Sequence, residues 1–201
     1  IHYFILDAFV EIALLDAAAD TADPCEVFFT RTNELRELFK FEFYFPRRVD
    51  YRAEIEKRVC ERFGEWEETI RRDEASVRDL LKDLQLLVAH GVLRSFVDAY
   101  RIVASVLADA GAEAIDDESA FLAQCLKTGK QQLLQRRVFS AESISKSLYQ
   151  NGLQLANYRG LLAANQELER RSLHDEFRRI TDRLDEILAI TLAKAEETTR
   201  G

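Results

Sequence analysis

The sequence predicts an all-α protein built from several helices. Hydrophobic residues make up 47% of the 201 residues, and there are only 7 Gly and 2 Pro. This composition favours one globular, largely helical core. Apolar residues recur every three or four positions through most of the chain, which is the period of amphipathic helices. One aromatic segment departs from that period, so the prediction allows one short extended stretch.

The first two helices are predicted over residues 1–19 and from Pro24 to Phe39. Asp7 and Glu11 lie four positions apart, so they share one narrow polar stripe and leave most of the first helix to be buried against a partner surface. Pro24 suits the first turn of the second helix, because its fixed φ matches the helix and its missing N–H has no partner there.

The aromatic run that follows has a period of two. Its alternate positions are Phe39, Phe41, Phe43 and Phe45, and Arg47 and Arg48 close it after Pro46. Alternation is typical of extended chain. A helix that continues through the run is the alternative.

Further helices are predicted over residues 51–70, 77–89, 93–110 and 140–158, with another around residues 121–126. Gly91 is expected to end the second of these as a left-handed C-cap, and Gly111 to end the third. Asp117 or Ser119 is expected to cap the helix that follows. After residue 163 the composition becomes rich in charge. We therefore divide the chain into a helical domain, residues 1–163, and a charged amphipathic terminal helix, residues 164–201.

Composition also limits the partners. With 36 acidic against 28 basic residues the net charge is -8, which disfavours nucleic-acid binding. The three cysteines and three histidines lack ligand spacing, so no metal site is predicted. No stretch reaches the roughly 18 apolar residues of a membrane span. The chain begins with Ile and has no basic segment before its apolar start, so we expect no signal peptide and a longer natural protein.

Other polar residues are interpreted as structural. The arginine pairs mostly have acidic neighbours, which predicts solvated helix faces; they lie at 71–72, 136–137, 170–171 and 178–179. His90 is expected at a helix C-terminus, where an imidazolium would favour the helix dipole.

Three motifs occur in order along the second half of the chain. The first is Tyr100-x-x-Val103-Ala104-x-x-Leu107, the second is Gly129-x-Gln131 followed by residues 132–134, and the third is a helix from Ser140 that ends in Arg159-Gly160-Leu161-Leu162. With upstream segments 1–15, 35–46 and 88–100, they resemble the C-terminal portion of bacterial glycerol-3-phosphate acyltransferases. Two places depart from the family pattern: Tyr158 stands for an Asn, and Arg136 and Arg137 stand where small residues are usual.

The resemblance implies a longer enzyme. That family transfers a fatty acyl group from acyl carrier protein or coenzyme A to the sn-1 hydroxyl of glycerol 3-phosphate, without metal or prosthetic group. Its catalytic motifs precede the part resembled here. We therefore expect a structural, inactive part that packs through residues 1–19 and 39–45 on a missing N-terminal catalytic domain. The expected location is peripheral, at the cytoplasmic face of the bacterial inner membrane.

The His-x4-Asp spacing of that family's catalytic pair occurs here at His2 and Asp7. Residues five apart on one helix are rotated by about 140°, so these side chains would not meet. The residues between them are also bulky and apolar, unlike the family motif. We therefore predict no catalytic residue in the chain.

The candidate contact site is the run Phe39, Phe41, Phe43, Phe45, Arg47 and Arg48. Aromatic rings next to arginines are typical of proteins seated at a lipid interface. Packing on the missing domain is the alternative, and we favour it. A stand-alone helical adaptor that binds another protein through residues 167–195 is the alternative to an enzyme part.

Overall fold

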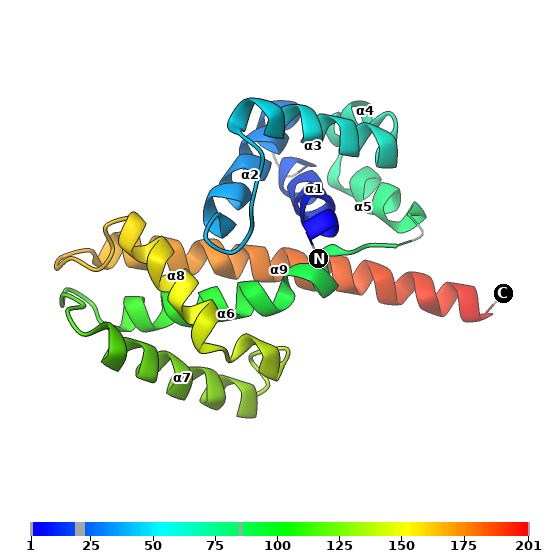
Figure 1. The fold of residues 1–201 in the computed structure, drawn as a ribbon. Helices are drawn as coiled ribbons and strands as arrows, with labels where there is room; N and C mark the ends of the chain where they lie inside the picture. The colour runs from blue at the N-terminus through cyan, green and yellow to red at the C-terminus, as the bar shows by residue number, and fades with distance from the viewer. Residues whose placement is uncertain (1, 19–22, 85, 201) are drawn as a thin grey trace. The chain divides into compact units, whose positions relative to one another are not determined.

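The computed structural model describes residues 2–18, 23–84 and 86–200, and the regular structure in those ranges is entirely helical (Figure 1). The predicted all-α fold is therefore confirmed. The chain forms two compact units, unit 1 with residues 1–93 and 183–201 and unit 2 with residues 94–182.

Unit 1 is built around its first helix, α1 (His2–Ala18). Four helices pack against it: α2 (Pro24–Phe39), α3 (Arg48–Phe63), α4 (Trp66–Arg72) and α5 (Glu74–Asp83). Almost every side chain from Ile5 to Ala17 is buried. We expected this helix to pack on a missing domain, and that expectation is wrong, because helices of the same unit enclose it.

The single helix predicted over residues 51–70 is two helices. α3 ends at Phe63, Gly64 follows with φ +54°, and its N–H donates to the Cys60 carbonyl at 3.1 Å. α4 then begins at Trp66. The apolar spacing continues across this break, with Val59 and Ile70 both buried. Periodicity alone therefore did not reveal the turn, which Gly64 makes because it tolerates positive φ.

Residues 39–45 do not form the extended stretch that the sequence allowed. α2 ends at Phe39, and the N–H groups of Glu42 and Phe43 both donate to the Phe39 carbonyl, at 2.9 and 3.0 Å. The chain therefore turns back at this point. The alternation of aromatic and polar residues reflects a turn with aromatic side chains on its inner side, and neither a strand nor a continued helix.

Unit 2 contains most of α6 (Ala89–Asp109), α7 (Glu118–Leu134), a short 3-10 turn (Ala141–Ser143), α8 (Lys146–Tyr158) and the first half of α9 (Glu167–Arg200). Its buried residues include Tyr100 and Phe177, whose ring centroids lie 5.7 Å apart at an edge-on angle. The division of the chain at residue 163 stays a prediction.

The caps of these helices were predicted in part. Gly111, with φ +57°, follows α6, and Asp117 Oδ1 accepts from the Ala120 N–H at 2.9 Å, as expected. Gly91 does not end a helix: α5 stops at Asp83, and Gly91 and His90 lie in the first turn of α6. The expected role of His90 at a helix C-terminus is therefore wrong. Residue 140 precedes only the 3-10 turn, and α8 begins after Ser145.

Candidate functional site

The phenylalanines of the candidate contact run form an internal cluster. Phe39 and Phe43 are buried, and Phe41 and Phe45 are partly covered. The Phe9 ring of α1 lies 6.0 Å from the Phe39 centroid and 5.8 Å from the Phe45 centroid. These rings stabilise unit 1 from inside, because α1 lies against them.

The two arginines of the run lie at the surface instead. The side chain of Arg47 is 91% exposed and that of Arg48 is 70% exposed. Tyr44 and Val49, which the sequence reasoning did not select, are 90% and 85% exposed. Contact of this segment with lipid or with another domain stays a prediction, and its surface part is residues 44 and 47–49.

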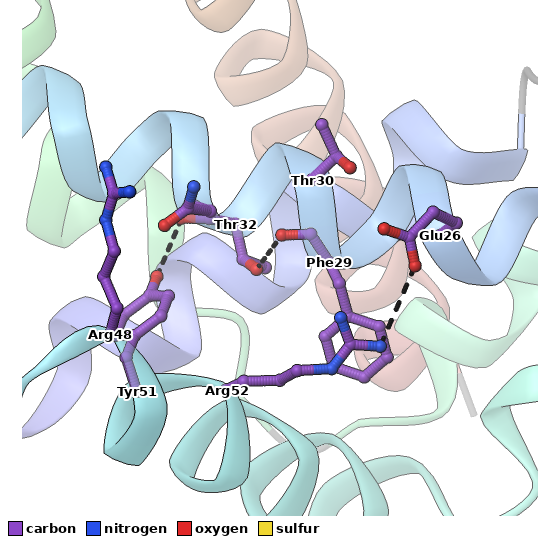
Figure 2. Close-up of a pocket in the computed structure, with 8 residues that line it drawn as sticks. Glu26, Phe29, Thr30, Thr32, Arg48, Tyr51 and Arg52 are labelled. Atoms are coloured by element: carbon purple, nitrogen blue, oxygen red, sulfur yellow. Dashed lines mark hydrogen bonds and ion pairs between the residues drawn. The ribbon is translucent and has the colours of Figure 1, made fainter.

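A pocket of about 210 Å³ lies between α2 and α3 beside these arginines. Figure 2 shows Arg48 and Arg52 on opposite sides of Tyr51, with the Arg52 guanidinium over the Phe29 ring and pointing away from Arg48. The Tyr51 hydroxyl donates to the Thr32 carbonyl at 2.7 Å, which fixes the two helices together. Sequence reasoning missed Arg52. The signal was present, since Arg48 and Arg52 are four apart and share one face of a helix.

The polar stripe of α1 binds arginines of α3. Asp7 Oδ1 lies 3.0 Å from Arg58 Nη1, and Glu11 Oε1 lies 2.8 Å from Arg62 Nη2. The Glu11 carboxylate is fully buried and also accepts from the N–H groups of Val88 and Ala89, with the shorter bond at 2.8 Å. Glu11 thus caps the start of α6. Burial raises the pKa of Glu11 against the opposing effect of Arg62 and these N–H groups.

The His2 and Asp7 pair gains no support as a catalytic pair. Both residues lie on the single helix α1, so their side chains leave it in directions about 140° apart, as expected. Asp7 is held by Arg58, and the side chain of His2 lies outside the described residues.

Gly129, in the second motif, makes room for a buried tyrosine. A Cβ at this position would overlap the Tyr149 hydroxyl and would lie 3.3 Å from Ile102 Cδ1. Tyr149 is fully buried, and burial raises the pKa of its phenol. Its hydroxyl finds no hydrogen-bond partner among the described residues. The glycine therefore serves the packing of α7 on α8.

The end of α7 explains one departure from the family pattern. Arg136 has φ +56°, and the next N–H, of Arg137, donates to the Gln132 carbonyl at 2.9 Å. This is the bonding of a left-handed C-cap, where glycine is favoured. The Arg137 carbonyl in turn accepts from Arg101 Nη2 at 2.6 Å. The third motif ends similarly, with Gly160 at φ +73° after α8.

Arg170 is not on a solvated face, so the interpretation of that arginine pair is wrong. Its side chain is fully buried, and all three guanidinium nitrogens donate to carbonyls of unit 2. The acceptors are Gly111 at 2.6 Å, Leu161 at 2.8 Å and Ala163 at 2.9 Å. Arg170 therefore ties the loop after α6 and the loop after α8 to α9. No sequence signal separates Arg170 from the exposed Arg171 beside it.

Within the described ranges, no three His, Cys, Asp or Glu side chains are grouped so that they could hold a metal ion. A helix long and apolar enough to span a membrane is likewise absent from those ranges.

Comparison with known proteins supports the resemblance carried by the motifs. The family model of the glycerol-3-phosphate acyltransferase C-terminal region matches residues 1–189. The chain belongs to this family. It is 38% identical over 195 residues to a putative acyltransferase, PlsB1, of Mycobacterium bovis, an alignment that covers 93% of this chain and 31% of that protein. The PlsB1 proteins of two Mycobacterium tuberculosis strains give the same values.

The chain therefore spans 31% of the length of these curated relatives. No solved structure matches it at a significant level. In this member of the glycerol-3-phosphate acyltransferase C-terminal family, two motif glycines have structural explanations: Gly129 admits the Tyr149 hydroxyl, and Gly160 makes the turn after α8.

Proposed function

We propose that this chain is the helical C-terminal region of an enzyme that transfers a fatty acyl group from acyl carrier protein or coenzyme A to the sn-1 hydroxyl of glycerol 3-phosphate. The observation that carries the proposal is the family match over residues 1–189. The relatives named as putative acyltransferases, aligned over 93% of this chain, support it.

Within that enzyme the region has a supporting role. The motif residues that the family shares are engaged in packing and turns: Tyr100 lies edge-on to Phe177, and Gly129 adjoins Tyr149. Asp7, the acid of the His-x4-Asp spacing in α1, is paired with Arg58. We therefore assign acyl transfer to a catalytic domain that precedes this region and that this region contacts.

The proposed location is the cytoplasmic face of the bacterial inner membrane, as a peripheral protein. The exposed Arg47 and Arg48 support it, because cations near a surface attract anionic lipids at about 1 kcal/mol each. Tyr44 and Val49 beside them are exposed apolar residues that suit the interface.

The activity is tested by acyl transfer from palmitoyl-coenzyme A to radiolabelled glycerol 3-phosphate. The full-length protein that contains this region is compared with the 201-residue chain alone. We expect lysophosphatidate from the former and none from the latter. If the chain alone transfers acyl groups and His2→Ala abolishes this activity, the supporting role is overturned. If the full-length protein does not acylate glycerol 3-phosphate, the substrate assignment is overturned.

The location is tested separately by flotation with vesicles that contain phosphatidylglycerol. We expect the full-length protein to float and the Arg47→Ala/Arg48→Ala variant to bind less, while Arg71→Ala/Arg72→Ala, a pair on α4, serves as the matched control. If both variants floated equally, the segment with Arg47 and Arg48 would not be the part of the protein that contacts the membrane.

A further inference from the structure

The second half of α7 and the loop after it carry exposed basic and apolar side chains. Residues 127–146 hold five basic residues and one acidic residue, in a chain whose net charge is -8. The five cations are all exposed, and none forms an ion pair with a described residue: Lys127, Lys130, Arg136, Arg137 and Lys146. Leu134 and Phe139 lie among them in the sequence and are 86% and 59% exposed. We call these seven residues the basic patch.

The basic patch lies at one end of unit 2. Lys127, Lys130 and Leu134 are spaced by three and four positions, so they share one face of α7. Lys146 begins α8, and the next turn of α8 packs on α7 through the Tyr149 hydroxyl. The patch therefore extends from the end of α7, over the connecting loop, to the start of α8.

The loop of the basic patch is anchored to α6. The fully buried Asp98 accepts from the Phe139 N–H at 2.9 Å, and Arg101 Nη2 donates to the Arg137 carbonyl at 2.6 Å. The Arg94 guanidinium carbon lies 5.6 Å from the centroid of the Phe139 ring. These contacts hold the backbone of the loop in place, so its exposed side chains need little further ordering when a partner binds.

Arg136 places a cation where the backbone favours glycine. Its φ of +56° lies in the left-handed region, which a glycine would occupy without strain. The Arg136 guanidinium is exposed and pairs with no acid among the described residues, so the fold does not require its charge. Arg136 and Arg137 are also the positions at which this chain departs from the family pattern of small residues. Their charge is therefore a feature of this chain that its own packing does not explain.

Opposite charges lie at the two ends of α7 (Figure 1). Residues 109–118 hold five acidic residues and no basic one, whereas the basic patch lies toward the other end. Glu118 and Lys127, the nearest members of the two groups in the chain, are nine positions and about 14 Å apart along the helix. This separation exceeds the Debye screening length of about 8 Å at physiological salt. The acidic end therefore does not cancel the attraction of the patch to an anionic surface.

We propose that the basic patch binds the surface of an anionic lipid bilayer, with Leu134 and Phe139 among the head groups and the five cations on lipid phosphates. Clusters of about four to eight Lys or Arg residues are typical of such binding. The cations come from α7, the loop and α8, and a bilayer presents phosphates to all three at once. The proposal rests on the membrane location proposed above and adds a contact in unit 2 to the one at residues 44–49.

Binding is measured by flotation of the 201-residue chain with phosphatidylcholine vesicles that contain or lack phosphatidylglycerol. We expect flotation only with phosphatidylglycerol, and less of it as the salt concentration rises. Arg136→Gln/Arg137→Gln should weaken partitioning into the vesicles about thirtyfold, the effect of two cations near an anionic surface. The matched control is Arg178→Gln/Arg179→Gln, an exposed pair of unit 2 outside the basic patch, which should change partitioning less than about threefold.

A second set of variants tests the apolar side chains. Leu134→Ser should weaken partitioning about tenfold, whereas Leu168→Ser, at a 76% exposed leucine of α9, should leave it unchanged. The indole fluorescence of Phe139→Trp should shift to the blue when vesicles are added, while Trp66, 2% exposed, gives a constant background. Tyr158→Trp, at an exposed position at the far end of α8, should show no shift.

The proposal is overturned if the chain does not float with phosphatidylglycerol, or if the patch and control variants weaken flotation equally. Soluble polyglutamate is the probe for an acidic protein partner. If polyglutamate binds the chain, loses affinity in Arg136→Gln/Arg137→Gln, and the vesicles do not bind, the patch takes an acidic protein and the lipid proposal is wrong.

This result is separable from the tests of the proposed function. If the full-length protein floats and only Arg47→Ala/Arg48→Ala weakens its flotation, the membrane location stands and the contact through the basic patch is overturned. Failure of the acyl-transfer assay would leave the flotation result intact, because no patch residue takes part in the transfer.

Discussion

The Tyr149 hydroxyl lies against the α-carbon of Gly129, in the space that a β-carbon would fill. Because that hydroxyl is buried without a hydrogen-bond partner among the described residues, only van der Waals contact governs its fit. The first prediction is that Gly129→Ala lowers the free energy of unfolding by about 1–3 kcal/mol, the usual cost of an overfilled core. Chemical denaturation measures it.

The Tyr149→Phe variant shows whether this contact is the cause. Removing an unpaired buried hydroxyl should raise the free energy of unfolding by about 1 kcal/mol, and the double variant should recover most of the loss. Gly91→Ala is the control, since open space surrounds that helical glycine, and it should stabilise by about 0.5–1 kcal/mol. If Gly129→Ala destabilised the Tyr149→Phe variant as much as it destabilises the wild type, the overlap with the Tyr149 hydroxyl would not be the cause.

The second prediction concerns Glu11. Glu11→Ala leaves Arg62 and the N–H groups of Val88 and Ala89 without their acceptor, so we expect the free energy of unfolding to fall by about 3 kcal/mol. The matched control is Glu61→Ala, because Glu61 is exposed and paired only loosely with Lys57, at 3.9 Å. Its effect should stay below about 0.5 kcal/mol. If Glu11→Ala and Glu61→Ala lowered the free energy of unfolding by similar amounts, the capping role of Glu11 would be contradicted.

The third prediction is a pH dependence. Burial raises the pKa of Glu11 above 4.5 in the folded state, so the folded protein binds a proton more tightly than the unfolded chain. The stability of the wild type relative to Glu11→Gln should therefore be greatest below pH 4.5, and should fall as the pH rises through the folded pKa. Arg62 faces this carboxylate and Asp7 lies one turn away, and both remain in the Gln variant. A relative stability that grows with pH would mean that the pKa is lowered.

The fourth prediction concerns Arg170, whose guanidinium spans three carbonyls. A lysine ammonium is a single point donor and cannot reach all three. Arg170→Lys should therefore lower the free energy of unfolding by about 2–3 kcal/mol. Arg171→Lys, at the adjacent exposed position, should change it by less than about 0.5 kcal/mol. If the two substitutions proved equivalent in thermal unfolding, the carbonyl contacts would carry no net energy.

The fifth prediction is a stabilising substitution at the end of α7. Arg136 occupies the left-handed region with φ +56°, which costs a non-glycine residue about 1–2 kcal/mol. Glycine loses more conformational entropy on folding than arginine, and this loss offsets part of the relieved strain. Arg136→Gly should therefore raise the free energy of unfolding by about 0.5–1 kcal/mol. Arg137→Gly has no such strain to relieve, so it should lower the melting temperature or leave it unchanged. A destabilising Arg136→Gly would show that the arginine side chain contributes to the fold.

Sequence patterns located the helices well where the period and the cap agreed. Pro24 begins α2, Asp117 caps α7 and Gly111 follows α6, each as predicted, because these residues act through local geometry. The break at Gly64 was missed, since the apolar face of α3 continues in register into α4 and only the backbone turns.

The candidate site was harder to predict because it depends on which way side chains face. Phe39 and Phe43 looked like surface residues of an interface, yet the turn directs them into unit 1. Arg170 and Arg171 are indistinguishable as neighbours in sequence, and only the carbonyls of two distant loops select the first for burial. Contacts between residues that are distant in the chain produce no periodic pattern in the sequence, so the sequence does not predict them.

The capping of α6 by Glu11 couples segments 77 residues apart in the chain. The amide protons of Val88 and Ala89 are held by that carboxylate, so they can exchange with solvent only when α1 withdraws. Hydrogen exchange at these two sites should consequently report the opening of the first helix. The start of α6 and the whole of α1 would then behave as one cooperative folding element.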